Sequence, residues 1–445
     1  MKTSYRTAPV PSTEIPAGIP FIIGNELAER FSYYGMRAIL VVFMTQYLVD
    51  AQGHPAPMTE AAANAYFHLF VSLTYFTPFF GALLADTVLG KYRTILLLSM
   101  VYSIGHFCLA LDDTRTGLLV GQSLIALGAG GIKPCVSAHL GDQFGHSNQH
   151  LLSKVFSWFY LSVNAGAFVS MLLVPWLLQH YGAKTAFAVP GVLMFLATLI
   201  FWLGRYRFVH IPPAGLRFVR EALSGPGRII LARLCGIYLL IAMFWALFDQ
   251  TGSSWVLQAQ HMDRMMFGVE VLPSQIQAAN PLLIMVLTPL FYKVVYPLLS
   301  KVMPLTALVK IALGLFISVI AFAWVACLQM LIDAGHHPAI AWQLVAYVLL
   351  TSAEVMVSIT CLEFSYTQAP SVMKSFVMSM YMASVALGNL FTSAVNYVID
   401  NPDGSSRLPG ASYFWFFALL MIVTALAFAW FSRNYQERSY LQDEV

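Results

Sequence analysis

The chain has 445 residues, of which 58% are apolar (Ala, Val, Ile, Leu, Met, Phe, Trp, Tyr and Cys) and only 10% are charged. In a soluble domain about a quarter of the residues are charged. This composition therefore excludes a water-soluble globular protein, and it also excludes a disordered chain. The net charge of +3 is too small to indicate a nucleic-acid partner.

Twelve apolar segments follow one another along the chain, and each is long enough for a helix that crosses a membrane. None alternates with a period of two over ten residues, as the strands of a membrane barrel do. The pattern predicts an all-α integral membrane protein. The expected spans have the approximate limits 19–48, 62–85, 94–111, 117–140, 155–178, 185–204, 232–254, 274–297, 305–330, 341–362, 375–398 and 411–431.

The five cysteines all lie in or beside these apolar segments, and none forms a CxxC pair. We therefore expect small buried side chains in a reduced protein rather than disulfides or a metal site.

Lysine and arginine residues predict the orientation, because they concentrate in cytoplasmic loops. If the N-terminus is cytoplasmic, fifteen of the 24 basic residues lie on that side, namely Lys2, Arg6, Lys91, Arg93, Lys154, Arg205, Arg207, Arg217, Arg220, Arg228, Lys293, Lys301, Lys374, Arg433 and Arg438. Four lie in the outer loops: Arg115, Lys184, Arg264 and Arg407. The remaining five lie within spans, so both termini are expected in the cytoplasm.

The longest connection falls between the sixth and seventh spans and is rich in arginine and proline. This layout predicts two six-helix halves, as in the major facilitator fold. The expected parts are an N-terminal bundle, a basic cytoplasmic linker, a C-terminal bundle and a cytoplasmic tail, with the limits 1–204, 205–231, 232–431 and 432–445.

The first span carries four charged residues within twelve positions: Glu26, Glu29, Arg30 and Arg37. A charge at the membrane centre costs about 2.5–3.5 kcal/mol on insertion scales. At 100° per residue these four residues and Tyr33 share one helix face. That face must point into the bundle or into a water-filled cavity. A structural ion-pair ladder, with Glu26 and Arg30 four residues apart, is the alternative to a functional cavity.

Other polar residues interrupt later spans and are candidates for the same cavity: His68, Tyr75, Lys133, Asp249, Asn280, Glu354 and Asn389. We expect Pro134 to break the helix beside Lys133, and Asn280-Pro281 to open an unwound point in the eighth span.

These residues separate charge between the two halves. The cations Arg30, Arg37 and Lys133 lie in the N-terminal half, whereas Asp249 and Glu354 lie in the C-terminal half. A substrate with one negative and one positive end would match both, so the charges predict a proton-coupled transporter of a small zwitterion. Protons could reside on His68, Glu26, Glu29, Asp249 or Glu354, and histidine titrates nearest to neutral pH.

Several motifs resemble those of the proton-dependent oligopeptide transporter family. The first span reads NELAERFSYYGMRAIL, which fits that family's ExxERFxYYG motif at every fixed position. The segments GAGGIKPCVSAHLGDQF, FYLSVNAGA, FWALFDQTGSSWVLQA and AEVMVSITCLEFSYTQAPSVMKS are similar to further signatures, in the expected order. The similarity extends from about Ile22 to Phe431.

The resemblance implies roles for particular residues. Arg30 and Lys133 match positions that hold the carboxylate of a peptide, and Glu354 matches the position that receives its amino terminus. Glu26 and Glu29 match residues tied to proton coupling. Together with Arg37, the substrate-binding set is Arg30, Tyr34, Arg37, Tyr75, Lys133, Tyr160, Asn164, Trp245, Asn280 and Glu354. The proton-coupling set is Glu26, Glu29, His68 and Asp249.

Two departures from the family pattern stand out. The linker is too short for the two additional helices of many bacterial members, and the loop from Asp333 to Pro338 is too short for the outer domain of animal members. His68 stands where animal members have a coupling histidine. The chain therefore resembles a prokaryotic member with an animal-like core, and part of the proton role is assigned to His68.

The expected function is import of dipeptides and tripeptides with protons, across the inner membrane, by a monomer without cofactor or metal. Membrane lipid is the only other expected partner. A transporter of nitrate, an amino acid or another small solute is the alternative. A membrane enzyme is disfavoured because the sequence has no HExxH, GxSxG or CxxC motif. A signalling receptor is disfavoured by the short tail after the last span.

Overall fold

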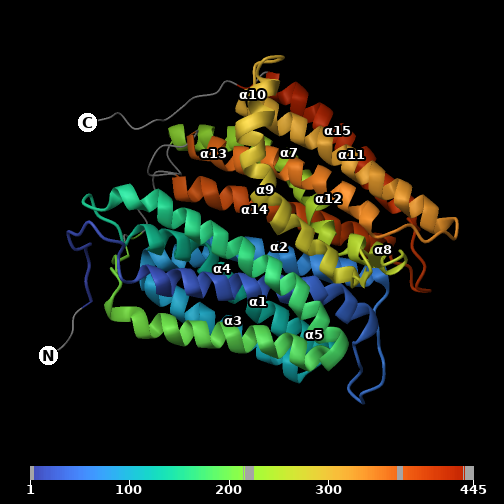
Figure 1. Cartoon of the computed structure of the whole chain (residues 1–445), viewed down its shortest axis with the longest axis horizontal. Coiled ribbons are helices and arrows are strands. Elements are labelled where there is room, and N and C mark those ends of the chain that lie inside the picture. The colour runs from blue at the N-terminus through green and yellow to red at the C-terminus, as the bar shows by residue number, and fades with distance from the viewer. Residues whose placement is uncertain (1–4, 214, 216–224, 368–373, 434, 436–445) are drawn as a thin grey trace. The chain divides into compact units, whose positions relative to one another are not determined.

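The computed structural model describes residues 5–213, 215, 225–367, 374–433 and 435. It is almost entirely helical apart from one short β-hairpin, and its internal contacts divide it into two compact units (Figure 1). Unit 1 comprises residues 1–58 and 73–217, and unit 2 comprises residues 59–72 and 218–445. Residues 59–72 thus group with the later part of the chain. The four parts expected from the sequence remain a prediction, and segments of the linker and the tail lie outside the described residues.

Unit 1 is built from long helices joined by short turns. In chain order these are α1 (Ile19–Gln46), the second part of α2 (Glu60–Leu84), the π-helical turn η1 (Ala85–Leu89), α3 (Lys91–Leu111), α4 (Arg115–Gly141), η2 (Gln149–Leu151), α5 (Leu152–Leu203) and η3 (Gly204–Tyr206). Helix α1 packs along α5, and α3 packs against α4 and α5.

Unit 2 begins with the first part of α2 and has more interrupted helices. The others are α7 (Gly225–Phe248), η4 (Asp249–Gly252), α8 (Ser254–Gln260), η5 (Pro273–Ala278), α9 (Ala279–Leu290), η6 (Phe291–Val295), α10 (Tyr296–Leu299), α11 (Ala307–Asp333), α12 (Ala341–Glu354), η7 (Val355–Ile359), α13 (Thr360–Thr367), α14 (Lys374–Ile399) and α15 (Ala411–Arg433). A hairpin of β1 (Met265–Met266) and β2 (Val269–Glu270) follows α8. Helix α11 packs against α12 and α15, and α14 against α7.

All twelve expected spans are helical in the described residues. Ten helices there are long and apolar enough to cross a membrane. Helix α1 is not among the ten, because it carries four charged residues. The fifth and sixth spans count as one, because two helices of α5 meet directly at Gly182, whose φ of +79° and ψ of 176° are not helical. The expected boundary between those spans therefore falls at this residue, without a longer loop.

The prediction that Pro134 breaks its helix is wrong, because α4 continues from Arg115 to Gly141. Proline removes the hydrogen bond to the carbonyl four residues earlier and crowds it. That carbonyl belongs to Gly130, and it lies against Gly81 of α2, where an added Cβ would stand 2.2 Å from the oxygen. The close approach of a glycine Cα to the freed carbonyl explains why the helix persists.

The expected unwound point at Asn280-Pro281 also lies elsewhere. The tight 3-10 turn η5 ends at Ala278, and α9 begins at Ala279. Pro281 therefore lies in the first turn of α9, where a missing backbone N–H leaves no intrahelical bond unmade.

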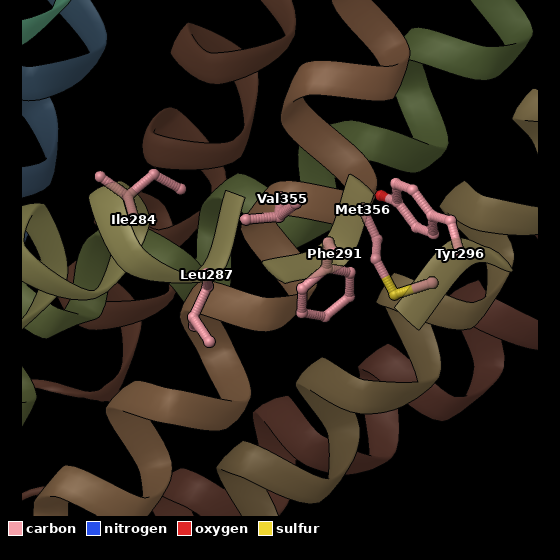
Figure 2. Close-up of a cluster of buried hydrophobic side chains, with 6 residues drawn as sticks. All are labelled: Ile284, Leu287, Phe291, Tyr296, Val355 and Met356. Atoms are coloured by element: carbon pink, nitrogen blue, oxygen red, sulfur yellow. The ribbon is translucent and has the colours of Figure 1, made fainter. Parts of the chain in front are cut away.

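Two π-helical turns pack against each other in unit 2. Figure 2 shows the buried cluster that joins them, with Phe291 of η6 beside Val355 and Met356 of η7. Ile284 and Leu287 of α9 and Tyr296 of α10 complete it. Turn η7 begins directly after Glu354, so this packing fixes the helix at the position of a candidate site residue.

Replacing Gly81 with alanine should lower stability by about 1–3 kcal/mol, because the new Cβ would overlap the Gly130 carbonyl. Gly24→Ala is the matched control, since nothing lies within 4 Å of an added Cβ in α1. Thermal unfolding of the purified protein in detergent compares the two. Equal unfolding temperatures for Gly81→Ala and wild type would contradict the contact described here.

Candidate functional site

The charged face of α1 is buried inside unit 1, as the sequence predicts. Glu26 is 2% exposed and Glu29 is fully buried. The Nε atom of Arg30 lies 2.6 Å from Oε1 of Glu26 and 3.1 Å from Oε2 of Glu29. One guanidinium thus holds two carboxylates in an apolar surrounding, where unpaired charges would be costly. This ion-pair cluster has one carboxylate more than its single cation.

Lys133 lies nearby within unit 1, between two aromatic rings. Its ammonium is 4.3 Å from the ring centre of Tyr33 and 4.0 Å from that of Tyr75. It also interacts electrostatically with Glu29. Lys133 is 8% exposed, and the ring faces stabilise a cation that water no longer solvates.

The other predicted residues of unit 1 differ in burial. Arg37 is buried, Tyr34 packs edge-on against Tyr33, and Tyr160 is 46% exposed. The Nδ2 atom of Asn164 donates to the backbone oxygen of Tyr160, one turn earlier in α5. The structure therefore brings Arg30, Glu26, Glu29, Lys133 and Tyr75 into two adjoining clusters, and places Tyr160 and Asn164 together on another helix.

In unit 2, Glu354 lies at the end of α12. Its carboxylate accepts a hydrogen bond of 2.7 Å from Nδ2 of Asn280, which is also 3.1 Å from the Thr351 hydroxyl. Glu354 and Asn280 are both half-buried. The amide presents the carboxylate without neutralising it, so Glu354 keeps the capacity to pair with a cation.

Trp245 lies in the same unit, against Tyr381. Their ring centres are 6.3 Å apart, and the Tyr381 hydroxyl is 3.0 Å from that of Ser358. Ser358 belongs to η7, the turn that follows Glu354, and Tyr381 interacts electrostatically with Glu354. Trp245 is thus linked to the surroundings of Glu354 through one aromatic neighbour.

His68 forms a buried hydrogen-bond chain with Asp249 in unit 2. Nδ1 of His68 is 2.8 Å from Oδ1 of Asn389, and Nδ2 of Asn389 donates to Asp249 at 2.6 Å. Nε2 of His68 is 2.8 Å from the Ser253 hydroxyl. His68, Ser253 and Asn389 are fully buried, and Asp249 is 4% exposed.

This chain accommodates either protonation state of the imidazole. The Asn389 oxygen faces His68, so Nδ1 carries the hydrogen that donates to it. In a neutral ring Nε2 accepts from the Ser253 hydroxyl, and in a charged ring Nε2 donates to the same oxygen. When His68 gains a proton, the Ser253 hydroxyl must rotate to accept a hydrogen bond from Nε2. The side-chain amide of Asn389 then separates the charged imidazole from Asp249.

The sequence did not assign roles to three residues that the structure places beside these clusters. Asn389 bridges His68 and Asp249, and Ser253 binds the second ring nitrogen. Tyr102 of α3 is fully buried and interacts electrostatically with Glu29 and Tyr33. Polar residues at 99, 102, 103 and 106 share one helix face, and that spacing was the available signal for Tyr102.

The described residues contain no group of three or more His, Cys, Asp or Glu side chains able to hold a metal ion. The expectation of a chain without metal or cofactor remains a prediction.

Long apolar helices that bury ionisable clusters inside each of two units are typical of multi-pass membrane transporters. The model of the POT family matches residues 92–223 and 226–416, and the chain belongs to that family.

Two similar relatives are animal proteins. Solute carrier family 15 member 2 of Mus musculus is 36% identical over 395 residues, which covers 78% of this chain and 53% of the mouse protein. Peptide transporter family 1 of Drosophila melanogaster is 37% identical over 376 residues, which covers 74% of this chain and 50% of the fly protein. The chain spans about half the length of the curated relatives it matches.

Solved structures give the fold. An auto-inhibited POT family peptide transporter has a TM-score of 0.86 and 37% identity, covering 96% of this chain and 99% of that one. The POT family transporter PepTSo has a TM-score of 0.85 and 36% identity, covering 95% and 99%. The chain has the major facilitator fold, as the sequence predicts.

Replacing Asn389 with leucine should destabilise unit 2 by at least about 2 kcal/mol, because it leaves the His68 ring and the Asp249 carboxylate buried without their shared partner. Ser384→Ala is the control on the same helix, since the Ser384 hydroxyl donates to the Tyr381 carbonyl in the preceding turn. The measurement is thermal unfolding in detergent. A leucine variant as stable as Ser384→Ala would contradict the proposed bridge.

Proposed function

We propose that the chain is a proton-coupled symporter that imports dipeptides and tripeptides by alternating access. The observation that carries the proposal is the separation of buried charge within a POT family chain: Arg30 and Lys133 lie in unit 1, and Glu354 lies in unit 2. Relatives named as peptide transporters support the substrate class.

The two ends of a peptide would meet opposite charges. Its carboxylate would bind Arg30 and Lys133, with Arg37 adding positive charge on the same helix as Arg30. Its ammonium would bind Glu354, which Asn280 already orients. Fixed charges at both ends limit backbone length, so dipeptides and tripeptides are favoured over longer chains.

Uncharged groups would hold the peptide backbone and side chains. Tyr34, Tyr75, Tyr160 and Asn164 offer hydroxyls and an amide, and Trp245 offers an aromatic surface. Apolar pockets discriminate weakly between side chains, by about 1–3 kcal/mol per methylene. Broad side-chain tolerance with strict demands on both termini is the expected specificity.

Protons would move on His68, Asp249, Glu26 and Glu29. Protonation of His68 changes the charge beside Asn389 and Asp249, and protonation of Glu26 or Glu29 releases Arg30 to bind a carboxylate. One proton crossing about 100 mV supplies about 2.3 kcal/mol, and a gradient of one pH unit adds about 1.4 kcal/mol. Together they support roughly 500-fold accumulation of a neutral zwitterion.

We place the protein in the cell inner membrane with both termini in the cytoplasm, on the distribution of lysine and arginine. No chemistry on the substrate and no cofactor is required. We expect a monomer to suffice, since each charged cluster is complete within one chain.

Counterflow of labelled dipeptide into liposomes tests the substrate directly. Unlabelled dipeptides and tripeptides should compete, whereas single amino acids and nitrate should not. Arg30→Ala should reduce dipeptide uptake at least about tenfold, because it removes a charge-assisted partner of the carboxylate. Arg233→Ala of α7 is the matched control. Competition by nitrate, or full uptake by Arg30→Ala, would contradict the proposal.

His68→Gln separates coupling from binding. Glutamine retains hydrogen bonding but cannot carry the proton, so proton-driven uptake should fall while peptide exchange persists. His106→Gln is the control, because His106 is also fully buried but lies in α3. Unchanged proton-driven uptake in His68→Gln would remove this residue from the coupling path.

A further inference from the structure

A cavity of about 360 Å³ lies at the end of unit 1 where α5 ends. Its wall includes the N-terminal arm, defined here as residues 5–17, and the segment that follows η3. Arg6 and Glu14 of the arm line it, together with Tyr206 and Arg207.

Hydrogen bonds hold the cavity walls in place. The backbone N–H of His210 donates to the Arg6 carbonyl at 2.7 Å, and Nδ2 of Asn148 donates to the Glu14 carbonyl at 3.1 Å. Gln143 is bonded in both directions to the backbone of Val209. The arm is therefore fastened to two other segments of the unit.

The cavity carries a net charge of +1. Arg6 and Arg207 are both exposed, and within the described part of the chain neither guanidinium has a carboxylate partner. Glu14 contributes the one negative charge. His210 beside the cavity adds none at neutral pH, because its burial lowers the pKa of the imidazole from its ordinary value. A ligand with one negative charge would balance the site.

An exposed apolar face of α5 precedes the residues of this cavity in the chain. Leu196, Leu199, Ile200 and Leu203 are spaced at i, i+3, i+4 and i+7, so they share one helix face, and they are 44–57% exposed. We name this face the α5 apolar strip. It ends three residues before Tyr206.

Aromatic and basic residues mark the membrane interface at the same level. The guanidinium of Arg205 stacks 3.9 Å from the Trp202 ring centre and 4.5 Å from that of Tyr206. Tryptophan and tyrosine favour the headgroup level of a bilayer. On this placement we expect the strip at acyl-chain depth and the cavity at headgroup depth.

We propose that this cavity binds the phosphodiester headgroup of an anionic phospholipid, whose acyl chains lie along the α5 apolar strip. Guanidinium groups bind phosphate oxygens with two parallel hydrogen bonds, which a lysine would not reproduce. The apolar strip favours a lipid over free phosphate, since a soluble anion would use the two arginines alone. The lipid would fasten the N-terminal arm to the end of α5.

Lipid binding to the purified full chain in detergent tests this proposal without reference to transport. Native mass spectrometry measures the affinity for phosphatidylglycerol and for phosphatidylcholine. Wild type should prefer phosphatidylglycerol by at least about tenfold, and the variant Arg6→Gln/Arg207→Gln should lose that preference. Arg205→Gln also removes one positive charge, but Arg205 does not line the cavity. This variant should keep the preference for phosphatidylglycerol.

A second pair of measurements distinguishes lipid from soluble anion. Leu199→Asn/Leu203→Asn should weaken phosphatidylglycerol binding several-fold, and inorganic phosphate should not raise the unfolding temperature as the lipid does. Unfolding temperatures measured without lipid show whether each variant is folded. The single variants Arg6→Gln and Arg207→Gln show how much each arginine contributes to lipid binding. Retained preference in the double arginine variant, equal loss in Arg205→Gln, or equal protection by inorganic phosphate would overturn the proposal.

Discussion

The organisation of both units depends on one constraint: an ionisable side chain taken out of water must be compensated by a nearby group. Arg30 forms ion pairs with two carboxylates, and Lys133 lies between two aromatic faces. Asn280 donates a hydrogen bond to Glu354. Rings and amides carry no net charge, so they stabilise the charge of Lys133 or Glu354 without neutralising it. On the proposed function, the missing charge is supplied by the two ends of the peptide.

Much of the fold was predictable from hydrophobic pattern alone. Long apolar segments must form helices in a membrane, because no water is present to satisfy the backbone. The charged face of α1 was also predictable, since residues spaced three and four apart share a face whatever surrounds them. Glu26 and Arg30 show this most clearly, and the structure joins them at 2.6 Å.

The rest depended on partners that lie far away in sequence. Pro134 alone predicts a break, whereas the structure has an intact helix with Gly81 packed against the Gly130 carbonyl. Asn389 became a bridge because of two residues distant along the chain. The π-helical turn after Glu354 has no local signal either. Neither charge nor hydrophobicity encodes such contacts, so a single sequence shows candidates for a site but not their pairing.

On the proposed function, the two ends of one substrate meet opposite charges, with the carboxylate at Lys133 and the ammonium at Glu354. Isothermal titration with a dipeptide, its C-terminal amide and its N-acetyl form, repeated for Lys133→Gln and Glu354→Gln, measures this most directly. The account predicts that Lys133→Gln loses only the preference for a free carboxylate, and Glu354→Gln only the preference for a free amine, each worth about tenfold or more. Loss of both preferences in each variant, or of neither, would contradict it.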